Sequence, residues 1–579
     1  MTRLWSYMIR YRGRYAIGIG CLVATGTLAM LVPYLLKRAV DTIAAGGSAS
    51  SVAWLAVAII VIAVVQGVVR TLSRFVIFNV GRDIEYDLRN DLFAHLERLP
   101  LAYYQRQQTG DLMSRLVNDI TAVRLLLGIG LLNMINTPIY YVYGVSIMVS
   151  LDWRLTIASL LTYPLALLFV KRSSRQLMER TLKVQEGLAA MSARVQESLS
   201  GIQVLQAYVR EGAERDAFRR LNDDFTAQSV GLARVRGTIM PVMRGVSAFG
   251  TLVLLWYGGL RVIAGALSLG DLVAFMGYLH LLAWPTMALG WMLSIVQRGR
   301  AALQRLEVVF RAEPTIDDRL AVTNGHALGG EVAFEHVGLS YGSGANGGRA
   351  LTDVSFTVPA GATLAIVGRT GAGKTSIVDL IPRLFDPTEG RITIDGRDLR
   401  EIPLGLLRRS IGFVPQDPFL FSRSVRANVR FGAPGADDAA LARAVEAAGL
   451  DRDLEELPRG LDTVVGERGI TLSGGQKQRV TLARALLVDP TILILDDALS
   501  SVDTETERRI LGHLRGVMRD RTSILIAHRI STVMDADLIL VVDGGRIVEA
   551  GDHASLLARG GFYADLFQRQ RLTEELEAL

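Results

Sequence analysis

The apolar residues of this 579-residue chain fall into two unlike patterns. Over roughly the first 300 residues they form runs long enough to cross a bilayer, which takes about 20 predominantly apolar residues. After that the apolar runs are short, and they alternate with helical periodicity and with turns rich in glycine and proline. The pattern predicts an all-α transmembrane domain over residues 1–320 and an α/β domain over residues 321–579.

Six segments of the first part meet or approach the length of a membrane span. They are residues 15–40, 52–77, 125–150, 154–170, 242–263 and 270–296. The short connections between them carry no Lys or Arg, whereas the links 78–124 and 171–241 are long and rich in arginine. By the positive-inside rule the long links, both termini and the α/β domain are cytoplasmic.

The two long links keep helical periodicity, which predicts helices that continue beyond the bilayer. The chain is expected to turn back near Tyr103–Gly110 and near Tyr208–Ala213. The tips of these helical pairs would stand far from the membrane, where a cytoplasmic domain could push on them.

Polar residues recur inside the predicted spans. Gln66, Arg70 and Arg74 have the spacing of one helix face. The third predicted span carries the polar residues Asn133, Asn136, Thr137 and Tyr140, and the sixth carries His280 and Trp284. Two interpretations stay open. The polar residues line a wet cavity that binds substrate, or the arginines snorkel to the inner interface and the rest form interhelical hydrogen bonds.

Composition adds little to this picture. The net charge of +6 is explained by the basic flanks of membrane helices, so it gives no reason to expect a nucleic-acid partner. The lone cysteine, Cys21, excludes an intrachain disulfide. Met1–Arg14 is basic, but the apolar segment after it is long enough to span the membrane, which argues against a cleavable signal.

A phosphate-binding pattern opens the second part of the chain. A buried strand is predicted over residues 362–367, and a loop that fits G-x-x-x-x-G-K-[ST] follows it directly. The glycines let backbone N–H groups cradle phosphates, Lys374 would reach the β- and γ-phosphates, and Thr375 would ligate Mg²⁺. The loop consists of Gly368, Arg369, Thr370, Gly371, Ala372, Gly373, Lys374 and Thr375.

Two adjacent carboxylates follow a second buried strand. The apolar run Ile492–Leu495 delivers Asp496 and Asp497 onto a loop. An acid after a strand commonly holds Mg²⁺ beside a phosphate, and together with the P-loop this predicts an ATP site with Asp496 as a metal ligand.

A second glycine-rich stretch lies about 100 residues after the P-loop. It consists of Leu472, Ser473, Gly474, Gly475 and Gln476. Its backbone N–H groups would stand at the start of a helix, where they can donate to an anion. This stretch resembles the signature loop of ATP-binding cassette (ABC) proteins. The resemblance implies that the loop grips ATP held by the opposite domain of a dimer.

Further positions match the family in order. Tyr341 matches the aromatic residue that stacks on adenine, although a strand-end tyrosine packed on the core is an alternative. Gln416 matches the glutamine that senses the γ-phosphate, contacts the metal and faces the membrane domain, and His528 matches the switch histidine that holds the γ-phosphate. The remaining matches are Gly466–Gly469, an exporter-type segment, and Ser500–Asp503, a loop at the dimer interface.

The resemblance extends over the whole chain, which is similar to an ABC exporter half-transporter of the multidrug and lipid type. Looser family patterns occur at residues 99–104, 109–112 and 197–201. The resemblance implies ATP-driven export of amphipathic or hydrophobic compounds by alternating access, in the bilayer of a bacterial inner membrane, by this chain and a second half-transporter. An ATP-gated conduit or regulatory subunit, and an importer of siderophore type, remain alternatives.

Asp497 departs from the family pattern. Most members have glutamate after the magnesium aspartate, where it polarises the attacking water. Aspartate is one methylene shorter, and a misplacement of about 1 Å costs about 100-fold in rate. The departure resembles the degenerate subunit of heterodimeric ABC exporters, so we expect slow hydrolysis here and a partner with glutamate. Two alternatives stay open: the loop shifts so that Asp497 works adequately, or the chain forms a homodimer, since His528 is intact.

Overall fold

The computed structural model describes residues 2–322, 327–341, 348–466, 469, 471–498, 504–527, 529 and 533–577. The chain divides into two compact units. The first contains Met1–Glu97 and Gly110–Ala312, and the second contains Arg98–Thr109 and Glu313–Leu579. The second unit therefore includes a short segment of the first long link.

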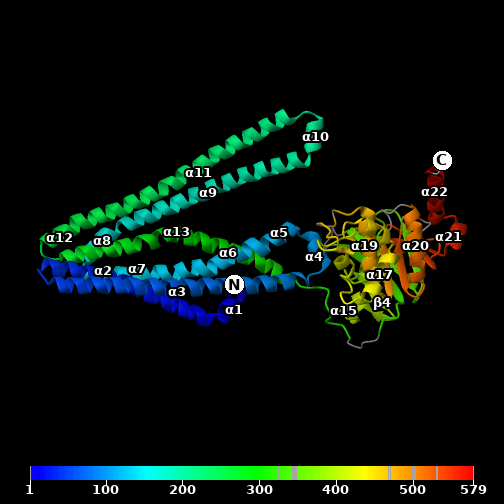
Figure 1. Cartoon of the computed structure of the whole chain (residues 1–579), viewed down its shortest axis with the longest axis horizontal. Coiled ribbons are helices and arrows are strands. Elements are labelled where there is room, and N and C mark those ends of the chain that lie inside the picture. The colour runs from blue at the N-terminus through cyan, green and yellow to red at the C-terminus, as the bar shows by residue number, and fades with distance from the viewer. Residues whose placement is uncertain are drawn as a thin grey trace. The chain divides into compact units, whose positions relative to one another are not determined.

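The first unit is helical throughout its described part (Figure 1). Its helices are α1 (Thr2–Arg10), α2 (Arg12–Ala44), α3 (Ala49–Leu96), α5 (Thr109–Ser114), α6 (Ile120–Leu125), α7 (Leu131–Leu151), α8 (Trp153–Leu160), α9 (Thr162–Ser200), α10 (Ile202–Ala207), α11 (Glu211–Val253), α12 (Gly259–Ile263) and α13 (Leu269–Arg311). Three π-helical turns interrupt them: η1 (Arg115–Asp119), η2 (Leu126–Gly130) and η3 (Leu254–Gly258).

Five helical stretches of the described residues are long and apolar enough to cross a membrane. They are Arg12–Ala44, Ala49–Leu96, Thr109–Leu151, Glu211–Ile263 and Leu269–Arg311, and they contain five of the six predicted spans. The predicted span 154–170 is helical as well, in α8 and the start of α9, but it does not form one of the five. Several of its side chains lie outside the described part of the chain.

The helices continue well beyond the predicted spans. α3 has 48 residues, and at 1.5 Å per residue it is about 72 Å long, more than twice the ~30 Å of a bilayer's hydrocarbon core. As predicted, the chain turns back through the short helix α4 (Leu101–Arg106) and again through α10, after which α11 begins at Glu211. α9 and α11 run side by side as a long pair (Figure 1).

The second unit contains two sheets. The strands of the antiparallel sheet have the order β2-β1-β4-β5, with β1 (Val332–Tyr341), β2 (Gly348–Val358), β4 (Glu389–Ile394) and β5 (Arg397–Asp398). The larger sheet has the order β10-β9-β3-β8-β7-β6. Its strands are β3 (Thr363–Gly368), β6 (Ile411–Val414), β7 (Ile492–Asp496), β8 (Thr522–Ile526), β9 (Leu538–Asp543) and β10 (Arg546–Gly551), and all pairs except β9–β10 are parallel.

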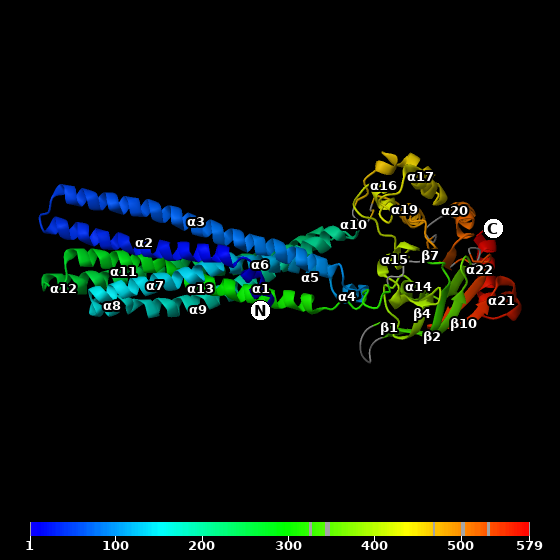
Figure 2. The same ribbon diagram turned by 90° about the horizontal axis from the view of Figure 1, so that it is seen from below.

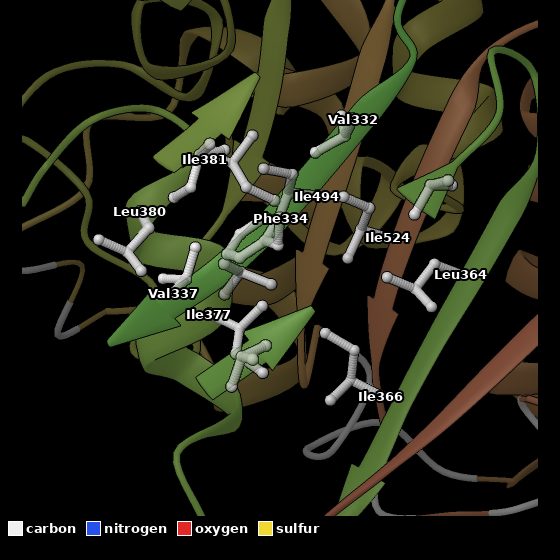
Figure 3. Packing of buried hydrophobic residues seen from close by; sticks show 14 of the residues in the cluster. Val332, Phe334, Val337, Leu364, Ile366, Ile377, Leu380, Ile381, Ile494 and Ile524 are labelled. Atoms are coloured by element: carbon white, nitrogen blue, oxygen red, sulfur yellow. The ribbon is translucent and has the colours of Figure 1, made fainter. Parts of the chain in front are cut away.

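The second unit also contains helices, which lie around the two sheets (Figure 2). They are α14 (Lys374–Leu380), α15 (Leu404–Arg409), α16 (Val425–Val429), α17 (Asp438–Ala447), α18 (Asp451–Glu456), α19 (Gly474–Leu487), α20 (Thr504–Met518), α21 (His553–Arg559) and α22 (Phe562–Glu577). The apolar runs of β7 and β8 are buried along their full length, as expected of parallel strands covered on both faces. Phe334, Ile377 and Ile494 point toward one another in the core between β1, α14 and β7 (Figure 3).

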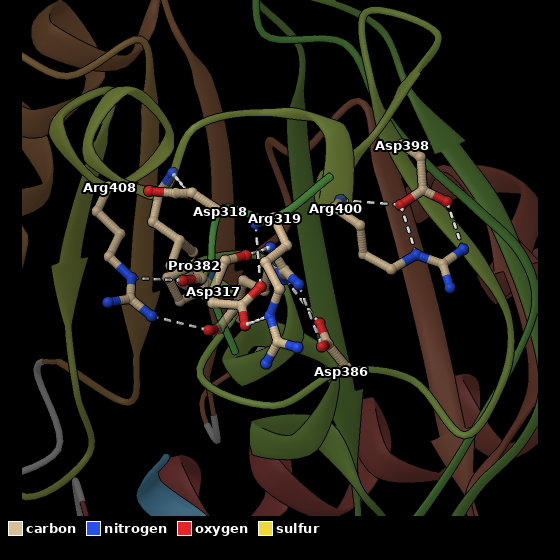
Figure 4. A network of polar contacts seen from close by, with 10 residues as sticks. Asp317, Asp318, Arg319, Pro382, Asp386, Asp398, Arg400 and Arg408 are labelled. Carbon is tan, nitrogen blue, oxygen red and sulfur yellow. Dashed lines mark hydrogen bonds and ion pairs between the residues drawn. The ribbon is translucent and has the colours of Figure 1, made fainter. Parts of the chain in front are cut away.

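The segment that joins the two parts of the chain, residues 313–322, is held on the second unit by a polar network (Figure 4). The Leu404 N–H donates to Oδ1 of Asp318 at 2.7 Å, and Arg383 donates through Nη1 to the Asp317 carbonyl at 3.0 Å. Arg383 is only 4% exposed, and Arg408 donates to its carbonyl at 2.9 Å. The joining segment is therefore bound to the rest of the second unit at Asp317 and Asp318.

Candidate nucleotide site

The topology of the larger sheet gathers the predicted site at one edge. β3, β8, β7 and β6 are neighbours and parallel, so their carboxyl ends lie together. The P-loop follows β3, Asp496 ends β7, and Gln416 comes two residues after β6. His528 comes two residues after β8, but it lies outside the described residues, as do Glu467, Arg468 and Ser500–Asp503.

Glycine is required where the P-loop meets α14. Gly373 has φ +103°, and a Cβ atom there would lie 2.8 Å from the Ala350 carbonyl oxygen. Gly371 has φ +81°, but a Cβ atom there would meet open space. The loop thus keeps its backbone open at Gly371 and packs it against β2 at Gly373, a shape that fits a phosphate cradle.

Lys374 is the first residue of α14 and is only 7% exposed. Its Nζ donates to the carbonyls of Gly368 at 2.8 Å and Arg369 at 3.0 Å, so the ammonium lies inside the loop. Burial lowers the pKa of Lys374, while the charges of Asp496 and Asp497 act against that shift. The lysine and both acids therefore share one electrostatic environment.

The two acids have different surroundings. Asp496 is 1% exposed at the end of β7, whereas Asp497 is half-buried and has φ +50°. The Asp497 N–H donates to the Ile526 carbonyl at 3.0 Å, which ties this turn to β8. Carboxylate and hydroxyl oxygens are the ligands that Mg²⁺ prefers. Asp496 and the exposed Thr375 therefore fit the metal as a donor set, and Gln416, also exposed, follows the adjacent strand.

Tyr341 lies at the end of β1 and packs beside the P-loop helix. Its hydroxyl donates to Oγ of Ser376 at 3.0 Å, and its ring meets Phe385 edge-on with centroids 5.2 Å apart. Burial raises the pKa of Tyr341. The packing alternative is thus observed, and stacking on adenine stays a prediction.

The signature loop caps its own helix. The Gln476 N–H donates to Oγ of Ser473 at 3.2 Å, and the Ser473 N–H donates to Oε1 of Gln476 at 3.0 Å, which completes a capping box at the start of α19. Among the described residues, no hydrogen bond or ion pair joins Ser473–Gln476 to the P-loop. Arg479, one turn further on, pairs in a bidentate manner with Asp453, at 2.5 and 2.6 Å.

Two residues near the site escaped the sequence analysis. Asp379 follows Thr375 by one helical turn, and burial, with a smaller contribution from the charge of Asp496, raises its pKa to about 6. Its position four residues after Thr375 on a predicted helix could have revealed it. Arg484 of α19 is half-buried and donates to the Asn428 carbonyl of α16 at 2.8 Å, and no sequence pattern indicated this.

Comparisons with known proteins agree with this architecture. The family model for the ABC transporter transmembrane region matches residues 15–286, and the ABC transporter model matches residues 351–500. The chain is 36% identical over 576 residues to the probable multidrug resistance ABC transporter ATP-binding/permease protein YheI of Bacillus subtilis, covering 99% of this chain and 98% of that protein.

Two further similarities extend over nearly the whole chain. The ATP-dependent lipid A-core flippase of Syntrophus aciditrophicus is 32% identical, with 96% of this chain and 92% of that protein covered. The solved structure of a bacterial Atm1-family ABC exporter with ATP bound superposes with a TM-score of 0.78 at 30% identity, over 96% of this chain and 98% of that one. The chain therefore belongs to the ABC exporter family of half-transporters, in which a helical transmembrane domain precedes an ATP-hydrolysing cassette and two such halves dimerise.

Proposed function

We propose that this chain is one half of an exporter that uses ATP and Mg²⁺ to move amphipathic or hydrophobic compounds across a bacterial inner membrane by alternating access. The observation that carries the proposal is the convergence of the P-loop, Asp496 and Asp497 at one sheet edge, in a chain whose N-terminal domain has membrane-spanning helices. The names of the relatives, multidrug and lipid A-core transporters, support the substrate class.

Each part of the site has a role in this proposal. The P-loop residues 368–375 hold the phosphates of ATP, and Tyr341 stacks on adenine. Asp496, Thr375 and Gln416 hold Mg²⁺, which when bound neutralises charge on the β- and γ-phosphates. Asp497 orients the attacking water, and His528 holds the γ-phosphate. Ser473–Gln476 contact ATP held by the partner chain, which agrees with their separation from this chain's own P-loop.

Asp497 makes this chain's own ATP site slow. Help from a general base is worth about 10²–10⁴-fold and requires hydrogen-bond reach. Asp497 begins from a backbone fixed by its hydrogen bond to Ile526, so it recovers little of the missing length. The intact capping box at Ser473 leaves the signature loop able to serve a partner's site. We therefore favour a heterodimer whose other member supplies glutamate.

The test compares ATP turnover of the purified chain with that of Asp497→Glu. We expect slow turnover for the wild type and an increase on the order of 100-fold for the variant, and no turnover for Asp496→Asn. Aspartate tolerates φ +50° better than glutamate, so ATP binding of each variant is measured alongside. Fast turnover by the wild-type chain alone would contradict both the slow site and the heterodimer.

The slow site also fits a second function, an ATP-gated conduit or regulatory subunit in which ATP holds a gate. Oriented vesicles that contain the complete dimer distinguish the possibilities. Uphill, ATP-dependent accumulation of a fluorescent amphiphile excludes a passive conduit, and the side on which it accumulates separates export from import.

A further inference from the structure

A buried acid of α18 lies next to the start of the signature helix α19. In the acidic helix α18, Asp451, Glu455 and Glu456 are exposed, whereas Asp453 is only 8% exposed. A carboxylate in such a place is costly unless charged or polar groups compensate it. The partners of Asp453 therefore show which part of the domain this acid holds.

In the described part of the chain, two residues at the start of α19 donate hydrogen bonds to Asp453. Arg479 donates through Nε to Oδ2 at 2.5 Å and through Nη2 to Oδ1 at 2.6 Å, and its side chain is only 12% exposed. Gln476 donates through Nε2 to Oδ1 at 3.4 Å. The arginine compensates the buried charge, and the longer contact with Gln476 ties the acid to the signature loop itself.

The contact with Gln476 determines how the capping box of α19 closes. A glutamine amide has a donor side and an acceptor side, and a carboxylate only accepts. Asp453 holds the NH2 group of Gln476, which turns Oε1 toward the Ser473 N–H at 3.0 Å. With the amide reversed, two donors would face each other at Ser473 and two acceptors at Asp453. The acid thus selects the one orientation of Gln476 that completes the box.

The closed box leaves the hydroxyl proton of Ser473 for a ligand. Its Oγ accepts from the Gln476 N–H at 3.2 Å, and a hydroxyl that accepts a hydrogen bond still has its own proton to donate. The backbone of Ser473 is held at the same time, because its N–H donates to Oε1 of Gln476. A phosphate oxygen would therefore meet a donor on a fixed backbone, which needs little reorganisation.

We infer that Asp453 is a positioning residue for the ATP site that this chain completes on its partner. It acts through Gln476, which in turn fixes Ser473, while Arg479 compensates the buried charge. The inference rests on the proposed function, in which Ser473–Gln476 contact ATP held by the partner chain. It adds a residue of α18, outside every nucleotide motif of the sequence, to those that organise this site.

Two paired variants separate positioning from simple support of the fold. Both remove the buried ion pair as a whole, because replacing such a pair is often nearly neutral for stability, whereas removing one partner alone is not. Asp453→Asn/Arg479→Met keeps an acceptor for Gln476, since asparagine has a carbonyl oxygen. Asp453→Leu/Arg479→Met keeps none. A difference between the two variants therefore reports the contact of Gln476 with residue 453.

Amide hydrogen exchange of the complete transporter without nucleotide measures the loop directly. In Asp453→Leu/Arg479→Met, we expect the amides of residues 473–476 to exchange on the order of 5- to 10-fold faster than in the wild type, because the capping box opens. In Asp453→Asn/Arg479→Met they should exchange nearly as in the wild type. Equal exchange in the two variants would refute the inference.

ATP turnover of the complete transporter shows whether the order of the loop matters for hydrolysis. We expect Asp453→Leu/Arg479→Met to lower kcat on the order of 10-fold, and Asp453→Asn/Arg479→Met to lower it about twofold at most. Photolabelling of this chain by 8-azido-ATP, which reports ATP on its own P-loop, should be equal in the wild type and both variants. Asp451→Asn, at an exposed acid of the same helix, is the control and should match the wild type.

The outcomes distinguish a failure of this inference from a failure of the proposed function. Wild-type kcat in Asp453→Leu/Arg479→Met, or loss of photolabelling together with kcat, would overturn the inference and leave ATP-driven transport by the wild type intact. No ATP turnover by the wild-type transporter would instead contradict the proposed function. Hydrogen exchange would then still decide whether Asp453 holds the signature loop.

Discussion

At the scale of single residues, Gly371 and Gly373 of the P-loop differ in a way that predicts different outcomes. An alanine at either position pays about 1–2 kcal/mol for the left-handed backbone. Only at Gly373 does the new methyl group also collide with backbone, at the Ala350 carbonyl. We predict that Gly373→Ala abolishes binding of a fluorescent ATP analogue, whereas Gly371→Ala retains most of it. Equal losses in the two variants would show that strain alone controls the loop.

Asp379 predicts a pH dependence of stability. Its pKa is raised to about 6 in the folded chain, mainly by burial and then by Asp496. A carboxyl whose pKa is raised by folding lowers the free energy of unfolding once it ionises. This loss is absent below the unfolded pKa of about 4 and reaches its full value above about 6. Asp379→Asn removes this loss, so we expect the variant to be more stable than the wild type at pH 7.5.

The size and control of this effect follow from the same reasoning. After allowance for partial exposure, the gain is on the order of 1–2 kcal/mol. Thermal unfolding without nucleotide or magnesium measures it, and the difference between the two proteins should vanish near pH 4. A difference that persists at pH 4 would assign it to packing rather than to ionisation.

At the scale of secondary-structure elements, Arg484 connects α19, the helix that follows the signature loop, to residues 419–428. It donates to the Asn428 carbonyl at 2.8 Å, to the Phe419 carbonyl at 3.0 Å and to Oδ1 of Asn428 at 3.1 Å. Burial lowers its pKa to about 10. Arg484→Met removes all three hydrogen bonds, although the Phe421 N–H still donates to Oδ1 of Asn428 at 2.9 Å, so we expect a loss of about 1–3 kcal/mol.

Thermal unfolding of the solubilised chain tests this prediction. Arg443→Met, at an exposed site on α17, is the control and should leave the unfolding temperature unchanged. Arg484→Lys should recover part of the loss, because it restores one donor but not the planar fork. An unchanged unfolding temperature for Arg484→Met would show that water replaces the arginine at this junction.

The elements also show how far the sequence predicts the structure. β3, the P-loop and α14 were predicted because a local pattern specifies strand, loop and helix in succession. The sequence does not show which strands lie beside β3, because pairing between β3 and β8 joins residues far apart in the chain. The contact of Ala102 with the core of the second unit and the hydrogen bonds of Arg484 to Asn428 depend on packing that no local pattern encodes.

At the scale of the whole molecule, the single cysteine makes the predicted topology testable. In a Cys21→Ser background, Ala45→Cys lies in the first short connection, and Gln108→Cys lies in the turn of the first long link. If the long links are cytoplasmic, a membrane-impermeant maleimide should label only Ala45→Cys in intact cells. Both variants should react once the membrane is opened. Labelling of Gln108→Cys in intact cells would reverse the orientation.

The bound joining segment decides where the cassette can be cut. A fragment that starts at Leu328 would deprive the buried Arg383 guanidinium of the Asp317 carbonyl and leave the Leu404 N–H without Asp318. A fragment that starts at Glu313 keeps both acceptors. Biochemists who wish to crystallise or label the cassette alone should therefore include residues 313–322 as part of the folded domain and not remove them as a linker.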